Sequence, residues 1–536
     1  MTDIDEQVSL WIADEVDDAA ADQLRALQAS ARDGDESAAA ELADRFSGPL
    51  TFGTAGLRGP LRAGPNGMNR VVVRRAAAGL AAWLSDQGRS GEPVVVGFDA
   101  RHGSTDFALD SAAIFAAAGF EAWIMPRHLP TPVLAFAVLK LHAAAGVMVT
   151  ASHNPPQDNG YKVYAADGAQ IIPPADSEIE AAIHAVGPTR EIPMNPDLVE
   201  TLTESIVDDY VRAVSGLVAA DGPRDLSVVY TAMHGVGADV ARTVFAAAGF
   251  VEPVPVPQQD RPDPDFPTVA FPNPEEPGAL DLALALAAER HADIVIANDP
   301  DADRCAAAVP TPDGSWRMLR GDEVGALLAD ALMRKGVRGT YATTIVSSSL
   351  LGAMARANRL GYRETLTGFK WISRAAEDLV YGYEEALGYA VAPDLVRDKD
   401  GISAALLVAE LAADLKARGS SLLTRLDELA AEYGRHATDQ LSVRVEDLSR
   451  ITDMMARLRA DPPAQLLGAD ASVDDLLPDA DVVRLSTPTA RVVVRPSGTE
   501  PKLKAYLEVV LDGGTAEQAS EALRQLRAEI ADVLGV

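Results

Sequence analysis

One serine, Ser152, follows a short apolar segment and is surrounded by residues suited to handling a phosphate group. Residues 147–164 read VMVTASHNPPQDNGYKVY, and the small apolar residues at 143–150 predict a central strand of a parallel sheet. The Pro-Pro and Asp-Asn-Gly groups that follow predict a loop. Because ligands of open α/β sheets bind beyond the carboxyl ends of the strands, Ser152 could act as a nucleophile or phosphate carrier beside His153 and Lys162. The alternative is an ordinary turn with a capping serine.

Three aspartates, Asp299, Asp301 and Asp303, follow a second apolar segment in ADIVIANDPDADR. Three carboxylates in one tight loop repel one another unless a cation lies between them. Hard oxygen ligands at this spacing favour Mg²⁺. An EF-hand is excluded because its sixth and twelfth positions, Gly and Glu, are Arg304 and Pro310 here. An acidic solvated turn and a phosphatase-type loop with Asp299 as nucleophile remain open as alternatives.

Three further segments carry side chains that could bind a phosphorylated sugar. Glu384 and Glu385, in YGYEEALGY, could accept hydrogen bonds from sugar hydroxyls or could simply begin a helix. RPSGTEPK, beginning at Arg495, joins a guanidinium to a turn whose backbone amides could bind an anion, although a plain hairpin loop is the alternative. FGTAGLRG adds glycines that permit close backbone approach, and Arg58. His234 is interpreted as a structural histidine.

The charge of the chain excludes some partners. With 47 basic and 79 acidic residues the net charge is −32, which argues against binding to nucleic acid or to an anionic membrane. Positive charge is nevertheless concentrated locally, because five of the eight lysines lie in or beside these segments, namely Lys162, Lys370, Lys399, Lys502 and Lys504. This concentration favours a small anionic substrate.

The location predicted from the sequence is the cytoplasm. No run reaches the roughly 18 apolar residues that a membrane-spanning helix needs. The acidic N-terminal residues lack the basic and apolar regions of a secretory signal. Cys305 is the one cysteine, which excludes an intramolecular disulfide and a cysteine-based metal cage.

Strand-like and helix-like segments alternate along most of the chain, which predicts βαβ units and parallel sheets. The predicted strands lie within 93–100, 143–151, 226–235, 292–300 and 339–348, and the predicted helices within 106–119, 238–250, 280–290 and 322–336. The proline-rich segment 253–278 is interpreted as an irregular excursion from one domain. Residues 486–511 predict two strands around a tight loop, and 516–533 a helix, so the last hundred residues predict a separate α+β domain.

Taken together, these segments closely resemble the α-D-phosphohexomutase superfamily of phosphoglucomutases and phosphomannomutases. The similarity runs in order from FGTAGLR near residue 52 to RPSGTEPK near residue 502, and TASHNP with DPDADR is its most specific part. FGTAGLR, HNPPQDNGYKVY, GFKWI and EEALGY resemble the phosphoglucomutase-2-like branch of bacterial phospho-sugar mutases. The resemblance implies an α/β fold with four domains around a central cleft. These are a phosphoserine-bearing domain at 1–205, a metal-binding domain at 206–318, a sugar-binding domain at 319–435 and a smaller α+β phosphate-binding domain at 436–536.

The resemblance also assigns roles to residues. It makes Ser152 the phosphoryl carrier and a Mg²⁺ ligand together with Asp299, Asp301 and Asp303. The other catalytic candidates are His153, Lys162 and Arg58, and the substrate-binding candidates are Arg304, Glu384, Lys399, Arg495, Ser497, Gly498 and Thr499. Lys162 is the preferred general base, which requires burial and positive neighbours to lower its pKa, and His153 is the weaker candidate.

The implied function is a phosphohexomutase that interconverts hexose 1-phosphate and hexose 6-phosphate, of glucose or mannose, through a phosphoserine and a bisphosphorylated intermediate. It would require Mg²⁺ and a sugar bisphosphate activator such as glucose 1,6-bisphosphate. The expected partner is a small sugar phosphate, with no nucleic acid or membrane, and the expected state is a monomer with oligomers left open.

One departure affects the choice of sugar. Many hexomutases carry Glu-x-Ser-x-Gly where this chain has Glu384-Glu385-Ala386-Leu387-Gly388. Ala386 removes one hydroxyl contact to the sugar, and a lost hydrogen bond loosens or shifts selectivity. A phosphopentomutase acting on ribose or deoxyribose phosphate is therefore the alternative, and a sugar phosphatase is a weaker one.

Overall fold

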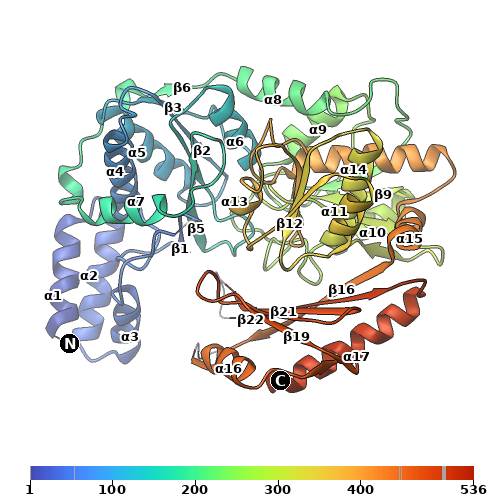
Figure 1. The fold of residues 1–536 in the computed structure, drawn as a ribbon. Helices are drawn as coiled ribbons and strands as arrows, with labels where there is room; N and C mark the ends of the chain where they lie inside the picture. The colour runs from blue at the N-terminus through green and yellow to red at the C-terminus, as the bar shows by residue number, and fades with distance from the viewer. Residues whose placement is uncertain (1, 54, 446, 448, 498–501) are drawn as a thin grey trace. The chain divides into compact units, whose positions relative to one another are not determined.

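The computed structural model describes residues 2–53, 55–445, 447, 449–497 and 502–536. They form two compact units, which are described separately (Figure 1). Unit 1 contains the chain up to Met318 together with Gly388–Asp414. Unit 2 contains Leu319–Leu387 and Leu415–Val536.

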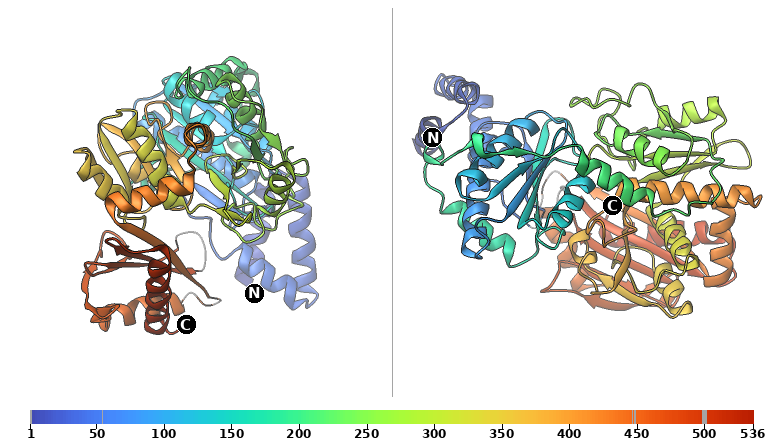
Figure 2. Two further views of the ribbon diagram at one scale, coloured as in Figure 1. Left: turned by 90° about the vertical axis from the view of Figure 1, so that its right-hand side faces the viewer. Right: turned by 90° about the horizontal axis from the view of Figure 1, so that it is seen from above.

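Unit 1 begins with three helices that stand together at one end of the unit (Figure 2). These are α1 (Thr2–Asp14), α2 (Asp18–Arg32) and α3 (Glu36–Arg45). The carboxylates of Asp17 and Asp35 cap α2 and α3, because each accepts hydrogen bonds from the first backbone amides of its helix. The helices bury Val8, Leu24 and Leu42 in a small apolar core.

The first sheet of unit 1 has the strand order β1-β5-β4-β2-β3-β6. Its strands are β1 (Leu57–Pro60), β2 (Pro93–Phe98), β3 (Glu121–Ile124), β4 (Ala145–Val149), β5 (Asp158–Ala165) and β6 (Glu200–Thr201). The accompanying helices are α4 (Arg70–Asp86), α5 (Ser104–Ala117), α6 (Thr131–Lys140), α7 (Ala175–His184) and α8 (Ser205–Ser215). Every residue of β4 is buried, as expected for a central strand.

The sheet is mixed rather than purely parallel. Strand β4 is parallel to β2 on one side but antiparallel to β5 on the other. The physical reason is the length of the connection, because only residues 150–157 join β4 to β5. A parallel crossover needs about a dozen residues or more, so this loop closes an antiparallel pair.

The second sheet of unit 1 has the order β11-β10-β9-β7-β8. Its strands are β7 (Val228–Thr231), β8 (Val254–Pro255), β9 (Ile294–Ala297), β10 (Ala306–Pro310) and β11 (Trp316–Met318), with helices α9 (Ala238–Ala247) and α10 (Asp281–Arg290). The proline-rich segment 253–278 contains the two residues of β8 and otherwise only turns and bends, as predicted. Unit 1 also contains the segment Gly388–Asp414, with β15 (Gly388–Ala390) and most of α14 (Gly401–Ala417), and β15 is not a strand of this sheet. Gly388 forms an isolated backbone bridge with Arg304.

Unit 2 contains three parallel strands in the order β13-β12-β14 and a separate antiparallel sheet in the order β16-β22-β21-β20-β19. The first group comprises β12 (Thr340–Thr344), β13 (Gly361–Thr365) and β14 (Leu379–Glu384), with helices α11 (Gly321–Arg334), α12 (Leu350–Ala357), α13 (Phe369–Ile372) and α15 (Leu422–Tyr433). The second comprises β16 (Arg435–Arg444), β19 (Ser472–Asp475), β20 (Val483–Ser486), β21 (Ala490–Pro496) and β22 (Lys502–Leu511), with α16 (Ser449–Ala460) and α17 (Ala516–Leu534). Strands β17 (Gln465–Leu466) and β18 (Ala469–Asp470) form a short separate pair.

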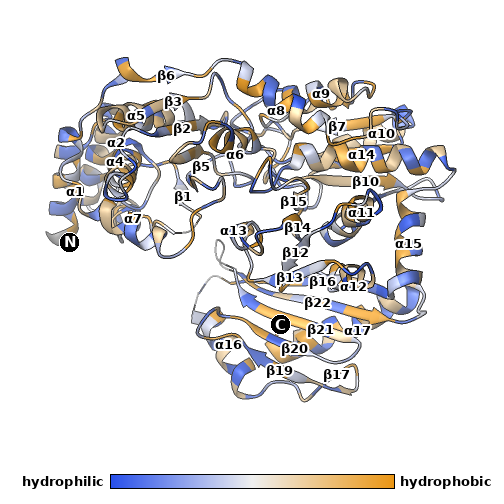
Figure 3. Cartoon of the chain, turned by 45° about the horizontal axis from the view of Figure 1, so that its top comes forward, coloured by the Kyte–Doolittle hydropathy of each residue, from blue (hydrophilic) through white to orange (hydrophobic). Residues whose placement is uncertain are grey.

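Alternation along β21 separates the two faces of the antiparallel sheet. Val492 and Val494 belong to the core beneath α16 and α17, whereas Val493 packs with Ile345 and Val346 from the loop after β12. Hydrophobic residues run along β21 and β22 (orange in Figure 3). This sheet therefore holds the β12 loop of the same unit in place.

The predicted strands and helices are confirmed. The five strands predicted by apolar runs are β2, β4, β7, β9 and β12, the four helices are α5, α9, α10 and α11, and the C-terminal hairpin and helix are β21, β22 and α17. Among the described helices, none is both long and apolar enough to cross a membrane.

Candidate active site

Ser152 lies in the loop that follows β4 and is almost fully buried, at 3% exposure. Its hydroxyl Oγ donates to Asp299 Oδ2 at 2.9 Å and lies 3.2 Å from His153 Nδ1. Its backbone φ is 53°, a left-handed value that is uncommon outside glycine and is concentrated at functional sites. The sequence-predicted carrier is therefore a buried serine held in an unusual conformation and facing a carboxylate.

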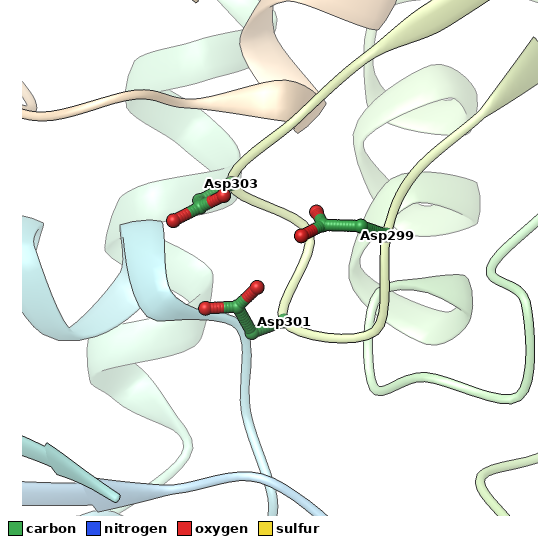
Figure 4. Close-up of side chains that lie close together, drawn as sticks. All are labelled: Asp299, Asp301 and Asp303. Carbon is green, nitrogen blue, oxygen red and sulfur yellow. The ribbon is translucent and has the colours of Figure 1, made fainter. Parts of the chain in front are cut away.

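The three predicted metal ligands form one cluster on the loop after β9. Asp299, Asp301 and Asp303 are all buried, and one ligand oxygen from each lies within 4.8 Å of the others. Figure 4 shows the three side chains gathered around this single loop. The loop is tightly packed from behind, since a Cβ on Gly235 would meet the backbone of Pro300 at 2.2 Å. That contact gives His234-Gly235 a packing role, with His234 Nε2 2.8 Å from Thr268 Oγ1.

Two of the three carboxylates each keep one oxygen without a hydrogen bond from the described residues. Asp301 Oδ2 accepts from Thr131 Oγ1 and from Lys162 Nζ, each at 2.7 Å. Asp303 Oδ2 accepts from Lys162 Nζ at 2.9 Å and lies 3.3 Å from Lys399 Nζ. Within the described part of the chain, the buried Oδ1 atoms of Asp301 and Asp303 have no hydrogen-bond partner. Buried carboxylate oxygens are costly to leave unpaired, so this donor set fits a divalent cation with oxygen ligands.

The pKa values of Asp299 and Asp303 shift in opposite directions. Burial, followed by the negative charges of Asp301 and Asp303, raises the pKa of Asp299 well above its usual range. Burial also disfavours ionisation of Asp303, but the positive charges of Lys162, Lys399 and Arg304 outweigh it and lower the pKa of Asp303. Three neighbouring carboxylates ionise together only if positive charge offsets their repulsion. The side chains of Lys162, Lys399 and Arg304 supply part of that positive charge.

Lys162 does not meet the condition set for a general base. Burial lowers its pKa, but the facing carboxylates of Asp301 and Asp303 outweigh burial, and the net result is a raised pKa. The amine is therefore a cation that pairs with the aspartates. By contrast, burial and the nearby charges of Arg304 and Arg58 lower the pKa of His153 well below its ordinary value, so its imidazole is neutral.

Three other predicted residues lie around the same cluster. The Arg58 guanidinium donates to Asn154 Oδ1 at 3.1 Å, which places it beside the serine loop. The backbone amide of Arg304 donates to Asp299 Oδ1 at 3.0 Å. Lys399 reaches Asp303 from the segment Gly388–Asp414. Unit 1 thus brings together the predicted carrier, metal ligands and cations, which are Ser152, His153, Lys162, Arg58, Asp299, Asp301, Asp303, Arg304 and Lys399.

The remaining predicted residues belong to unit 2. Glu384 is the last residue of β14 and is half-buried. Arg495 lies on β21 opposite Lys504, and the Ser497 amide donates to the Lys502 carbonyl at 2.8 Å across the hairpin. Gly498 and Thr499 lie outside the described residues. The structure describes this group separately from the serine and the aspartates.

A polar network in unit 2 supports the sugar loop predicted from the sequence. The Ser347 and Thr344 hydroxyls donate to Glu385 Oε2 at 3.2 Å and 3.3 Å. The Ser347 carbonyl in turn accepts from the guanidinium of Arg491, which lies 3.1 Å from buried Glu508 Oε2. Glu508 Oε1 accepts from Ser348 Oγ at 2.7 Å. Arg491 on β21 and Glu508 on β22 therefore fix the loop after β12, and Ser347 of that loop bonds to Glu385.

Family models match the chain in order along most of its length. Models described as phosphoglucomutase/phosphomannomutase alpha/beta/alpha domains I, II and III match residues 49–190, 208–314 and 320–433, and the model of the C-terminal domain of the same family matches residues 441–532. The chain belongs to this family. The match confirms the predicted family and an α/β fold of four domains.

The curated relatives that resemble this phosphoglucomutase/phosphomannomutase family member are named for three different mutase activities. A probable phosphomannomutase of Haemophilus influenzae is 47% identical over 455 residues, covering 82% of this chain and 93% of its own length. A phosphopentomutase of Pongo abelii is 36% identical over 550 residues, covering 91% and 89%. A phosphoglucomutase of Staphylococcus aureus is 33% identical over 504 residues, covering 88% and 91%.

A solved structure has the same fold. The crystal structure of a putative phosphomannomutase from Thermus thermophilus superposes with a TM-score of 0.74 at 28% identity, covering 91% of this chain and 99% of that one.

Two side chains that orient the site in this family member escaped the sequence analysis. Thr131, at the start of α6, donates both to the Asp301 carboxylate and, through its amide at 2.9 Å, to the Asp301 carbonyl. Asp398 Oδ2 accepts from Tyr164 and Gln170 at 2.8 Å, while its Oδ1 lies 3.3 Å from Lys399 Nζ. The acidic residues flanking Lys399 were a usable signal for Asp398, but a threonine at a helix start resembles any cap.

The role of Thr131 is testable through metal affinity. Thr131→Val keeps the shape but removes a hydrogen bond that orients Asp301, and loss of such outer partners typically costs about 10- to 100-fold in metal affinity. We expect weaker Mn²⁺ binding to the dephosphorylated protein by calorimetry. Thr243→Val, which alters an exposed hydroxyl bonded within α9, is the matched control. Equal affinity of both variants and the wild type would contradict this role.

The polar network of unit 2 is testable through acid stability. Burial raises the pKa of Glu508, but His436 and Arg491 outweigh it and bring the pKa from 4.5 down to about 2. The ionised carboxylate then stabilises the fold above about pH 4.5, by about 3 kcal/mol, and this contribution is lost as the pH falls toward 2. Glu508→Gln should unfold at lower denaturant at pH 7 and show a smaller loss between pH 5 and pH 3, followed by circular dichroism. The exposed Glu521→Gln is the control, and parallel pH profiles for both variants would refute the assignment.

Proposed function

We propose that the chain is a phosphohexomutase that interconverts hexose 1-phosphates and hexose 6-phosphates of glucose and mannose, with Ser152 as the phosphoryl carrier. Membership of the phosphoglucomutase/phosphomannomutase family gives the enzyme class, an intramolecular phosphotransferase. One observation carries the assignment of the residue. A buried serine donates to a carboxylate of the three-aspartate cluster at 2.9 Å, and two neighbouring carboxylates keep open oxygens.

The proposed metal is Mg²⁺, held by Asp299, Asp301, Asp303 and Ser152. When bound, it would supply positive charge that polarises the phosphoryl oxygens. The chain's own cations surround the same point, because Lys162 and Lys399 contact the aspartates and Arg58 lies beside the serine loop. Phosphoryl transfer depends on positioning and charge neutralisation more than on covalent help, and this arrangement supports both.

The proposed reaction begins with a hydroxyl of the sugar monophosphate attacking the phosphorus of phosphorylated Ser152. A new sugar oxygen–phosphorus bond forms as the bond to Ser152 Oγ breaks, the hydroxyl proton passes to a base, and Oγ takes up a proton from a general acid to become the serine hydroxyl. The product is a sugar bisphosphate, which turns over and returns its other phosphoryl group to Ser152. His153 replaces Lys162 as our candidate general base for Ser152, because its neutral Nδ1 lies 3.2 Å from Oγ and accepts the serine proton when Oγ attacks a phosphoryl group.

The proposed activator follows from the same cycle. A bisphosphate that leaves before the second transfer would strand an unphosphorylated Ser152. A sugar bisphosphate such as glucose 1,6-bisphosphate then rephosphorylates the serine by the reverse of the first step. Every turnover therefore depends on a phosphorylated Ser152.

Substitution of the serine tests the mechanism. Ser152→Ala should lose nearly all turnover and should take up no phosphate from glucose 1,6-bisphosphate, because no Oγ remains to carry it. Mass spectrometry of the intact protein and a coupled mutase assay measure the two effects. Ser177→Ala, a serine on α7 that bonds to a local carbonyl, is the control. Full activity of Ser152→Ala would overturn the proposed carrier.

The sugar is tested by direct comparison. We expect higher kcat/KM on the 1-phosphates of glucose and mannose than on ribose 1-phosphate, with Mg²⁺ and glucose 1,6-bisphosphate present. The nearer relative, a probable phosphomannomutase, favours a hexose, whereas Ala386 and the phosphopentomutase relative favour the alternative. Ala386→Ser should raise the ratio of hexose to pentose activity by restoring a hydroxyl contact. Faster turnover of ribose 1-phosphate would establish the phosphopentomutase instead, and release of inorganic phosphate would indicate a phosphatase.

A further inference from the structure

The loop that carries Ser152 has little secondary structure of its own with which to hold its shape. It joins β4 to β5, and several of its carbonyls face the interior. Buried carbonyl groups need hydrogen-bond donors, and a loop cannot supply them through a regular ladder. The left-handed backbone of Ser152 also requires support from neighbouring residues, because such conformations persist only when the surroundings enforce them.

One buried side chain supplies these donors. Arg101 lies just after β2 and is 4% exposed. Its Nη2 donates to the carbonyls of Ser152 and Asn154 at 2.7 Å and 2.6 Å. Its Nη1 donates to the carbonyls of Pro155 and Asp158 at 2.7 Å and 3.1 Å. A single guanidinium thus bonds three backbone oxygens of the serine loop and a fourth at the first residue of β5.

Arg101 is itself held from two sides. Asp99 Oδ1 accepts from the Arg101 amide at 3.0 Å and from Ser104 at 2.6 Å, and Asp99 Oδ2 lies 3.4 Å from Arg101 Nε. The ring of Phe266 covers the guanidinium, with Cζ 4.8 Å from the ring centroid, a cation–π distance. The gap among these groups is about 10 Å³, room for no more than one water.

Phe266 comes from the proline-rich segment 253–278, whose Glu275 also lies 3.7 Å from the Arg304 guanidinium. Its φ of 45° is again left-handed, and this turn presents the ring to the arginine. The excursion therefore contributes an apolar cover that excludes water from Arg101 and keeps its hydrogen bonds directed at the loop.

We propose that Arg101, covered by Phe266, is the positioning residue that holds Ser152 Oγ toward the aspartate cluster. It contacts neither the phosphoryl group nor the sugar in this assignment, and it acts only through the backbone of the serine loop. The inference rests on the proposed role of Ser152 as carrier.

The first test is Arg101→Lys, which keeps the charge but cannot bond four carbonyls with one ammonium group. We expect kcat to fall about 100-fold while KM for the sugar phosphate changes less than about threefold, because misplacing a reacting group by about 1 Å can cost that much. Phosphorylation of Ser152 by glucose 1,6-bisphosphate, followed by mass spectrometry, should slow by the same factor. If Arg101 served only to stabilise the fold, the protein that remains folded would keep the wild-type kcat and KM.

Arg224→Lys is the matched control. Arg224 also lies over a phenylalanine, 4.7 Å from the ring centroid of Phe250, and donates to a backbone carbonyl, that of Ala248, at 2.7 Å. It does not contact the serine loop, so its variant should retain wild-type kcat. Phe266→Leu should reduce kcat only about twofold to fivefold, because it removes the cation–π contact but keeps an apolar cover.

Chemical rescue keeps the test decisive if the lysine variant folds poorly. For Arg101→Ala, millimolar methylguanidine should accelerate serine phosphorylation, whereas methylammonium should not. Unchanged kcat in Arg101→Lys, a loss confined to KM, or equal rescue by the two cations would overturn the proposal. Absence of phosphate on Ser152 in the wild type would instead overturn the proposed function, so the two failures are distinguishable.

Discussion

Mutual repulsion among the carboxylates of Asp299, Asp301 and Asp303 is the constraint around which unit 1 is organised. The three groups share one buried loop, where water cannot screen them, so compensation must come from the protein or from a bound cation. Distant segments deliver it: β5 provides Lys162, the start of α6 provides Thr131, and the segment Gly388–Asp414 provides Lys399. The fold brings these segments together at the place where their charges and donors are required.

The same logic explains which residues could be predicted from the sequence. Ser152 and the aspartates were recognisable because each follows a buried apolar strand, and the carboxyl ends of such strands are where ligands bind. Their own types and spacing carried the information. Every strand and helix predicted from apolar periodicity was found for the same reason, since burial leaves a local pattern.

What escaped prediction depends on contacts between distant segments. Aspartates far along the chain raise the pKa of Lys162, so the lowered pKa that a general base at this position requires is not met. Thr131 acts through hydrogen bonds to a partner in another element, and nothing in its immediate sequence reveals that partner. Asp398 also bonds to a distant element, although its place beside Lys399 was a usable signal. The antiparallel pairing of β5 is different, because the short connection after β4 contained that information and could have been used.

The way Arg101 grips the serine loop also bears on how freely the loop can diverge. The guanidinium bonds only main-chain oxygens, so it is indifferent to the side chains of Asn154, Pro155 and Asp158. Mutational drift at those positions leaves the anchor intact, provided that the backbone keeps its path. The arginine has no such latitude, because no other side chain offers as many donors in a fixed plane. The side chains at these loop positions can therefore be substituted without loss of the bonds from Arg101, whereas Arg101 itself cannot be replaced. A loop redesigned for another substrate can keep the same arginine.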